Sequence, residues 1–394
     1  MKRREFIIAS AGLTALSLLP GRAIAGELIA GERRLAEPYD DNKVVRVYDP
    51  RVADYKFAGE AVPWKTINQA VLAEMLAKGL LEVSGEKSSA EAWKKLLAGT
   101  TQAKLSDKRV VVKVNFNNTI RDLHTTLNNS PALVTTLARS LADAGFQQRN
   151  ICFFDCSRPF PQEFKEVVRQ NRLEEVALLG KGDGLPASDQ MILLSDNRGL
   201  ERGGKPVDKC PIPQCLIDAD YLINVHLVKI HMAGVTGAMK NLFGLQEDVA
   251  RYMHHPGSKS FERAFHLPDI SLNEQIRKRA RLNLAEFIFG GHTPDTLDRF
   301  TNEAFFPGGL PASLIVSRSP FYHDTILRAF VEAEYETCVP VMKRFQNIGP
   351  DLWLRNSADR YPAWKFDQAG HPEAKREGRP RKDLAFEHVN YVSI

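Results

Sequence analysis

Between residues 108 and about 335, short apolar runs alternate with amphipathic segments, and this alternation constrains the fold more than any other feature of the sequence. The run "RVVVKVNF" is β-branched and bounded by polar residues, which is typical of a buried strand. The following "SPALVTTLARSLADAG" has Ser130 and Pro131 at its start and Gly145 just past its end, the signals of a helix. Further strands are predicted at "NICFFD", "ADYLINVH", "RLNLAEFIFGG" and "SLIVSR". The pattern predicts the α/β class, with a mostly parallel sheet and helices on both faces.

Four segments are expected along the chain. Residues 1–25 have the pattern of an export signal, and residues 26–105 form a lead-in with helical pieces. Residues 106–345 form the α/β core, and residues 346–394 a tail that wraps it as irregular structure. Within the core, the polar and His-rich residues 246–280 predict a long loop excursion over the surface. With 43% hydrophobic side chains in 394 residues, the chain can bury a core of this size.

The N-terminus favours export by the twin-arginine route. A basic start precedes the apolar residues 7–19, and the small-residue sequence "AIA" ends at residue 25. Arg3-Arg4 gives the signal its twin-arginine form, so the matching export machinery is an expected partner and the periplasm the expected location. The alternative is an ordinary secretory signal that carries Arg-Arg. The apolar residues 7–19 are too few for a spanning helix of about 20 residues, so no integral membrane span is expected in the mature chain.

Charge and cysteine spacing narrow the classes of function. The formal net charge is +5, of which the signal contributes +3 and the mature chain +2. A nucleic-acid partner is therefore not expected, because such binders carry a basic stripe. The five cysteines include two close pairs, Cys152 with Cys156 and Cys210 with Cys215, in a chain expected to be exported. Cys152 lies in an apolar run that favours a packed free thiol, and a short disulfide loop is open to Cys210 with Cys215. Their spacings are not those of a ferredoxin-type cluster.

Polar side chains follow each predicted strand of the core. In open α/β sheets, ligands bind at the carboxyl ends of the strands, so these side chains are expected to meet at one edge. Turn formation and helix capping are the structural alternatives for the Asn and Asp residues among them. The strand-end residues are Asn115 to Asn118, Asp155 with Ser157 and Arg158, His226 with Lys229 and His231, Glu286 with His292, and Ser317 with Arg318.

The stretch "INVHLVKIHMAGVTGAMKNLFG" concentrates this chemistry. If Thr236 caps the following helix, Lys240 lies near its first turn, where the partial positive charge of the helix end disfavours a cation. A bound anion is therefore expected, held by backbone N–H groups of the Gly-Thr-Gly turn. The alternative is a structural network in which Asp155, Glu286 or Asp324 neutralises the lysines. The residues expected to bind the anion or a cofactor are Asn115, Gly234, Thr236, Gly237, Lys240 and Asn241.

Catalytic and metal-binding roles can also be assigned to this region. His231 is the expected acid/base group, Lys229 a second anion-binding cation, and Asp155 a positioning carboxylate. The cofactor itself is unknown. A divalent metal is one alternative, and His226, His231 and Glu286 are its expected ligands, because loop ligands need no helical spacing.

The same stretch resembles the signature of domain-of-unknown-function family 362, an apolar strand followed by Pro-Lys-x-Lys-x-His, a Gly/Thr turn and Lys-Asn-x-Phe-Gly. The resemblance passes through Lys229, His231, Gly234, Thr236, Gly237, Lys240, Asn241 and Gly244, and it covers about residues 108 to 335. His226 and Val228 replace the usual Pro and Lys. Many relatives carry ferredoxin-type cysteine motifs, and this chain has none. The resemblance implies the fold and the place of the site, and it implies no reaction.

Three functions are therefore carried forward. The first is an exported protein that binds an anionic small molecule or cofactor at the strand ends, as an enzyme or a redox-linked protein. The second is a metal-dependent racemase, isomerase or hydrolase. The third is a non-catalytic periplasmic binding or assembly protein, so enzymatic activity is left open.

Overall fold

The apolar runs of the chain form a nine-stranded sheet in the order β11-β1-β10-β9-β7-β2-β3-β4, with β8 paired to β7. Strands β4, β3, β2, β7 and β9 are mutually parallel, and β10 is antiparallel to both of its neighbours. The expected α/β fold with a mostly parallel sheet is confirmed. The strands are β1 (Lys43–Tyr48), β2 (Val110–Lys113), β3 (Ile151–Asp155), β4 (Ala177–Gly180), β7 (Tyr221–His231), β8 (Gly234–Thr236), β9 (Ala280–Gly291), β10 (Ser313–Ser317) and β11 (Asn390–Ser393).

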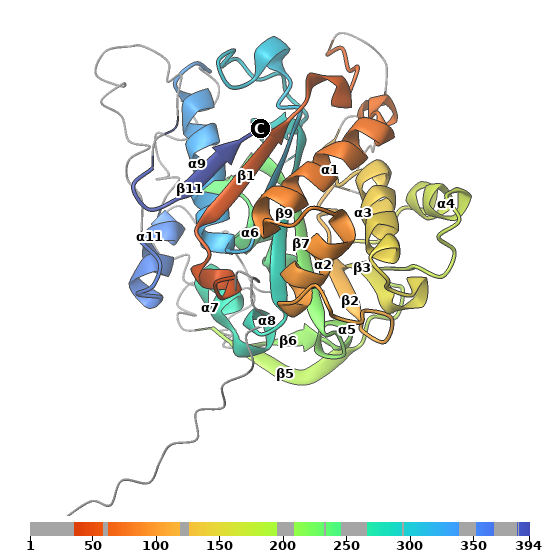
Figure 1. Ribbon diagram of the computed structural model, residues 1–394. Helices are drawn as coiled ribbons and strands as arrows, with labels where there is room; N and C mark the ends of the chain where they lie inside the picture. Colours follow the sequence, from red (N-terminus) through yellow and green to blue (C-terminus); the bar gives the residue numbers. More distant parts are fainter. Residues whose placement is uncertain are drawn as a thin grey trace, which may run out of the picture. The chain divides into compact units, whose positions relative to one another are not determined.

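Helices cover both faces of this sheet (Figure 1). On one face lie α1 (Gln69–Ser84), α2 (Ser89–Ala98) and α3 (Pro131–Asp143), and on the other α6 (Ala238–Asn241) and α9 (Pro320–Tyr335). The other helices are α4 (Gln162–Gln170), α5 (Gln214–Ile217), α7 (His266–Leu272), α8 (Glu274–Arg277) and α11 (Leu352–Arg360). A separate hairpin contains β5 (Ala187–Leu193) and β6 (Lys209–Pro213). Short 3-10 turns occupy Pro38–Asp40, Pro50–Val52, Pro63–Thr66, Gln148–Asn150, Leu242–Leu245 and Pro307–Gly309.

The structure is a computed structural model. Two expectations fall on residues that it does not describe: the export signal at residues 1–25, and the surface excursion as far as residue 265. The last part of that excursion, from residue 266, forms α7 and α8. The structure describes residues 35–57, 62–118, 126–194, 209–231, 234–245, 266–293, 295–338, 352–365, 384 and 386–394.

Local capping explains where the helices of the first face begin. The Ser130 hydroxyl accepts a hydrogen bond from the Leu133 N–H at 3.0 Å, and Pro131 occupies the first helical position of α3. Before α2, the Ser88 hydroxyl accepts from the Glu91 N–H and donates to the Glu91 carboxylate. The cap of α2 is therefore Ser88, and Ser89 is already inside the helix.

Alternate residues of the strands build two separate apolar layers. Val110 and Val112 of β2 pack in the layer beneath α1, α2 and α3, while Val111 packs in the opposite layer with residues of α6 and α9. A sheet buried on both faces leaves continuous apolar runs in the sequence. The face of any strand residue follows from this alternation, and this decides which polar side chains can meet.

Both ends of the described chain join the sheet. Strand β1 lies between β10 and β11, and α1 packs against β1 and β10, so the lead-in segment contributes to the core instead of preceding it. Strand β11 pairs in parallel with β1, so the tail expected to be irregular ends as an edge strand. The described residues from Leu35 to Ile394 form one compact unit.

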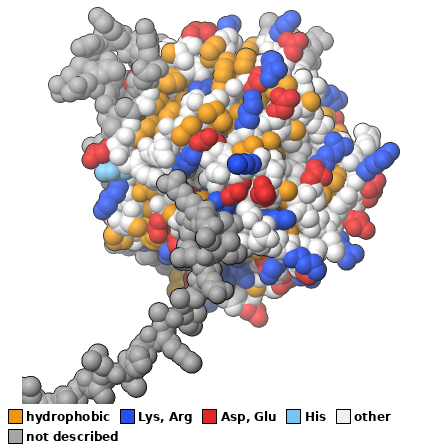
Figure 2. Space-filling view, in the orientation of Figure 1, with side chains coloured by type: hydrophobic (Ala, Val, Ile, Leu, Met, Phe, Trp, Pro, Cys, Tyr) orange, Lys and Arg blue, Asp and Glu red, His pale blue; other side chains and the backbone are white. Residues whose placement is uncertain are grey.

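On the face that Figure 2 shows, basic and acidic side chains are interspersed with apolar ones.

The sequence predicts that no helix of the mature chain spans a membrane. Among the helices that the structure describes, none combines the length and the apolar character that crossing a membrane requires.

The five cysteines are all free thiols. The close pairs Cys152 with Cys156 and Cys210 with Cys215 therefore form no disulfide in this structure. Burial raises the pKa of the Cys152 thiol to about 12 and raises that of Cys215 as well. Because the thiolate is the reactive form, these two thiols are poor nucleophiles at neutral pH.

Candidate functional site

A recess lies where β2, β3 and β7 end, and we call it the strand-end recess. Its free space for water-sized groups is about 40 Å³, whereas a single water needs about 10–15 Å³, so a small anion fits. Six residues that the sequence predicted for the site lie on its wall: Asn115, Asp155, Lys229, Thr236, Lys240 and Asn241. The other lining residues are Lys113, Asn117, Ser157, Phe243 and Gly244.

Asp155 is fully engaged by its neighbours. Its Oδ2 lies 3.2 Å from the Lys113 Nζ and accepts from the Phe116 N–H at 3.0 Å. Its Oδ1 accepts from the N–H and the hydroxyl of Ser157, at 2.9 and 2.7 Å. A Cβ at Gly244 would stand 2.7 Å from the Lys113 Nζ, so a glycine is needed beside this ion pair. The geometry gives Asp155 a positioning and neutralising role, and it leaves little capacity for proton transfer.

Two further lysines face the recess, Lys229 from β7 and Lys240 from α6. Burial, with a contribution from the charge of Lys229, lowers the pKa of Lys240 from 10.5 to about 7. Among the described residues, no carboxylate forms an ion pair with Lys240. The described lining of the recess has three lysines and one aspartate, and that aspartate is paired with Lys113.

Thr236 adds a polar group to the same wall. It is the last residue of β8, where it pairs with Lys229, and its side chain is 1% exposed. Its hydroxyl has no hydrogen-bond partner among the described groups. Leaving a buried hydroxyl unsatisfied costs about 1–3 kcal/mol, so this hydroxyl suits a bound molecule in the recess.

The start of α6 differs from the sequence prediction. Gly237, not Thr236, is the N-cap residue. Because Gly237 has no Cβ, the Asp324 side chain of α9 can lie against it. The Asp324 carboxylate accepts from the N–H groups of Ala238 and Met239, at 2.5 and 2.9 Å. These N–H groups are therefore not offered to an anion. The prediction that Thr236 caps this helix was wrong, and burial and the charge of Lys229 disfavour Lys240 as a cation.

Four buried asparagines form a chain of amide hydrogen bonds behind the recess, which we call the amide ladder. Asn115 donates to Asn241 at 3.1 Å, and Asn241 donates to Asn224 at 2.8 Å. Asn224 donates to Asn283 at 3.2 Å, and Asn283 donates to the backbone carbonyl of Arg318 at 2.9 Å. Asn115 and Asn241 thus fix the wall of the recess, and their amide groups are largely used by the protein.

The expected metal ligands do not converge. In the register of β7 and β9, Leu227 lies beside Glu286 and His226 beside Ala285, so His226 and Glu286 point to opposite faces of the sheet. β7 continues to His231, which places His226 in mid-strand and not at the strand end. The backbones of His231 and Gly234 pair in the turn to β8, but their side-chain surroundings lie outside the described residues.

His226 instead joins a buried polar chain. Its Nε2 lies 3.1 Å from the Nε2 of His323, and its Nδ1 lies 3.2 Å from the Leu227 carbonyl oxygen. A carbonyl only accepts, so the proton of His226 is on Nδ1, and the Nε2 of His323 must donate. With a neutral His323 ring, its Nδ1 accepts from the Ser317 hydroxyl at 2.8 Å, which is the shorter of two contacts of that hydroxyl, the other being to the Ser319 carbonyl oxygen at 3.1 Å. Both rings are neutral in this arrangement, and burial lowers the pKa of both.

Two other strand-end residues are placed differently. Because β10 is antiparallel to β9, the chain leaves β10 at Ser317 and Arg318 in the direction opposite to that of β7 and β9, and neither residue lines the recess. His292 follows β9 as expected, but its Nε2 lies 2.9 Å from the Glu334 carboxylate and its Nδ1 lies 3.7 Å from the Cys338 sulfur. Within the described part of the chain, these three form the one group of metal-ligating side chains. No local pattern indicates that Glu334 and Cys338 meet His292, which is more than 40 residues away in the chain.

Comparison with known proteins gives one positive finding. The model of a family described as "Domain of unknown function (DUF362)" matches residues 110–343, more than half of the chain. No curated protein matches the sequence. The matched residues include every described residue of the strand-end recess.

Proposed function

Since the chain belongs to domain-of-unknown-function family 362, whose description names no activity, we propose from the geometry that it binds a small anionic molecule in the strand-end recess. The observation that carries the proposal is Lys240, an ammonium group with a pKa lowered to about 7 and no carboxylate partner among the described residues. A bound anion would favour the protonated lysine and offset the cost of its burial. Phosphates and carboxylates are the matching ligand classes.

The lining residues have different roles in binding the anion. Lys240 and Lys229 supply the charge, and the unsatisfied hydroxyl of Thr236 supplies a hydrogen bond from the strand side. Asn115 and Asn241 hold the wall through the amide ladder. The recess is small, so the bound group is a single phosphate or carboxylate and not a dinucleotide.

Ligand-induced thermal stabilisation tests this proposal. Inorganic phosphate and acetate should raise the melting temperature of the wild-type protein, and Lys240→Met should abolish the shift because the charge is lost. Lys78→Met is the matched control, since Lys78 is exposed on α1 and does not line the recess. An unchanged phosphate shift in Lys240→Met would mean that this lysine is structural.

A second candidate function follows from the same pKa. A lysine with a pKa near 7 is partly neutral at physiological pH, and a neutral amine acts as a general base or forms a Schiff base with a carbonyl compound. Borohydride treatment in the presence of pyruvate, followed by mass spectrometry, should then place an adduct on Lys240. Binding of phosphate without any adduct or turnover would favour the non-catalytic binding protein instead.

We also propose that the protein is exported, and a metal-dependent activity is the alternative to anion binding. Export by the twin-arginine route rests on residues 1–25 alone, and N-terminal sequencing of the protein from a periplasmic fraction tests it. The metal-dependent alternative is weakened because His226 and Glu286 lie on opposite faces of the sheet. Elemental analysis of the purified protein tests that alternative directly.

A further inference from the structure

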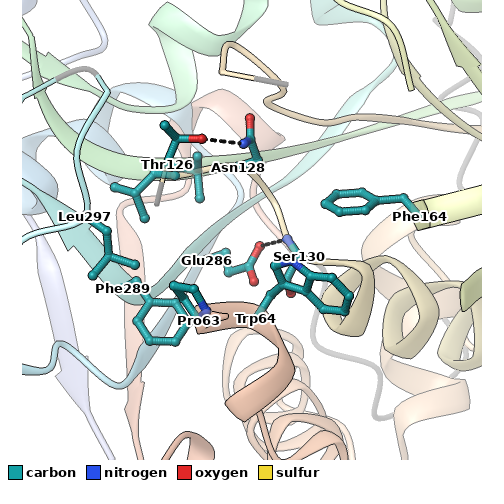
Figure 3. A pocket seen from close by; sticks show the side chains of 11 residues that line it. Pro63, Trp64, Thr126, Asn128, Ser130, Phe164, Glu286, Phe289 and Leu297 are labelled. Atoms are coloured by element: carbon teal, nitrogen blue, oxygen red, sulfur yellow. Dashed lines mark hydrogen bonds between the residues drawn. The ribbon is translucent and has the colours of Figure 1, made fainter. Parts of the chain in front are cut away.

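Glu286 lies in a small cavity on the face of the sheet that α1 and α3 cover, and we call this the Glu286 cavity (Figure 3). Its walls are mainly apolar and aromatic, with Trp64, Phe164, Phe289, Leu127 and Leu297, and Thr126, Asn128 and Ser130 add polar groups. Leu127 and Ser130 come from the segment that leads into α3, and Trp64 comes from a 3-10 turn before α1. The cavity is separate from the strand-end recess, because the two share no lining residue.

Only one oxygen of Glu286 is used by the protein. Its Oε2 accepts from the Asn129 side-chain amide and from the Ser130 N–H, each at 2.9 Å. Among the described residues, nothing donates a hydrogen bond to Oε1. Figure 3 shows one carboxylate oxygen joined to Ser130 and the other turned away from it, toward the side where Pro63 and Trp64 lie. The side chain is 3% exposed, so bulk water does not solvate this oxygen freely.

The carboxyl group also lacks a counter-ion. Among the described residues, no lysine, arginine or histidine forms an ion pair with Glu286. Burial raises its pKa, with hydrogen bonds from Ser130 and Asn129 acting in the opposite direction. The nearby Lys65 pairs with Glu163 at 3.5 Å instead. An uncompensated buried carboxyl group is costly, and a ligand that brings a positive charge would remove this cost.

The walls suit a cation as well. The faces of aromatic rings attract ammonium groups, and Trp is the strongest of the three aromatic side chains in this respect. Trp64 and Phe164 meet edge to face, with ring centroids 5.9 Å apart. The Lys65 ammonium lies 5.1 Å from the centroid of the Trp64 ring.

The size of the cavity selects among cations. Its free space for water-sized groups is about 20 Å³, compared with about 10–15 Å³ for one water. One ammonium group of the size of a water fits, and a trimethylated ammonium does not. We propose that the Glu286 cavity binds the primary ammonium group of a small organic amine, which donates a hydrogen bond to the free oxygen of Glu286.

Tryptophan fluorescence of the full chain tests the proposal, because Trp64 is part of the cavity and is one of four tryptophans. Titration with n-butylammonium should give a saturable change in the wild-type protein and no change in Trp64→Phe. n-Butanol is the neutral probe of the same length, and butyltrimethylammonium is the bulky one. Both should bind at least tenfold more weakly than n-butylammonium.

Glu286→Gln keeps the shape of the side chain and removes its charge, and it should weaken n-butylammonium binding at least tenfold. Glu175→Gln is the matched control, because Glu175 is an exposed residue outside the cavity. If Glu286→Gln does not fold, the pH dependence of n-butylammonium binding by the wild-type protein tests the proposal. Its affinity for n-butylammonium should then rise with pH as Glu286 ionises.

Two results would overturn the proposal. Equal responses to n-butylammonium and n-butanol would show that the cavity does not select a cation. Equal n-butylammonium binding by folded Glu286→Gln and by wild type would place the amine elsewhere. Neither result bears on phosphate binding at Lys240, which is measured separately by the thermal shift.

Discussion

Replacing Lys240 by methionine should stabilise the protein when no ligand is bound. In the folded chain the pKa of Lys240 is about 7, whereas the ordinary value of 10.5 holds in the unfolded chain. The unfolded chain therefore binds more protons between these two pH values, so stability rises with pH across this window. Lys240 lowers the free energy of unfolding by its full amount below about pH 7, and it has no such effect above about pH 10.5.

The magnitude follows from the same shift. At about 1.4 kcal/mol for each pKa unit, the full displacement corresponds to about 5 kcal/mol. Lys240 is only half-buried, and solvent screening reduces the effect, so we expect a gain of about 2 kcal/mol at pH 7. The charge of Lys240 that would bind an anion is thus the same charge that lowers the stability of the ligand-free protein, a trade-off that is common at functional sites.

Urea unfolding followed by tryptophan fluorescence measures this gain. The free energies of unfolding of wild type, Lys240→Met and Lys78→Met are compared at pH 7 and pH 10. The gain in Lys240→Met should fall by at least half at pH 10, while exposed Lys78→Met should stay within about 0.5 kcal/mol of wild type at both. A loss of stability in Lys240→Met at pH 7, or a gain independent of pH, would refute the reasoning.

Two further outcomes are expected. Burial lowers the pKa of His226 to about 4 and that of His323 as well, so the unfolded chain takes up protons first and stability falls as pH drops from about 6.5 toward 4. The melting temperature should fall less steeply over this range in a His226→Phe/His323→Leu variant, and parallel pH curves would contradict the assignment. Gly237→Ala should cost about 1–3 kcal/mol in urea unfolding, because its Cβ would stand 2.2 Å from the Asp324 carboxylate. Wild-type stability in that variant would show that α6 and α9 are not tightly packed there.

The parallel core could be predicted because its signals are local. Strands buried on both faces leave continuous apolar runs, and the strands at residues 110–113 and 151–155 lie inside the runs identified in the sequence. The helix after Ser130 begins at Pro131 as its capping pattern predicts. Six residues predicted for the site meet in the recess because parallel strands end at one edge of the sheet.

The departures all concern relations between distant segments. The run "SLIVSR" has the same pattern whichever way the strand runs, so its antiparallel direction and the position of Ser317 were not predictable. His226 resembled a strand end because basic side chains follow it, whereas β7 continues to His231 and the partner of His226, His323, is 97 residues away. The capping of α6 by Asp324 spans 86 residues and leaves no local signal.

The amide ladder has a consequence for folding as well as for the recess. Asn115 follows the end of β2, Asn241 lies on α6, and Asn224 and Asn283 lie on β7 and β9. Each amide donates to the next in a single direction. A slip of one residue in β7 or β9 would turn its asparagine to the other face of the sheet. The slipped sheet would then bury amides without partners, at a cost of about 1–3 kcal/mol for each. The ladder therefore acts as a register check on the central strands, and only the native alignment satisfies all of its members.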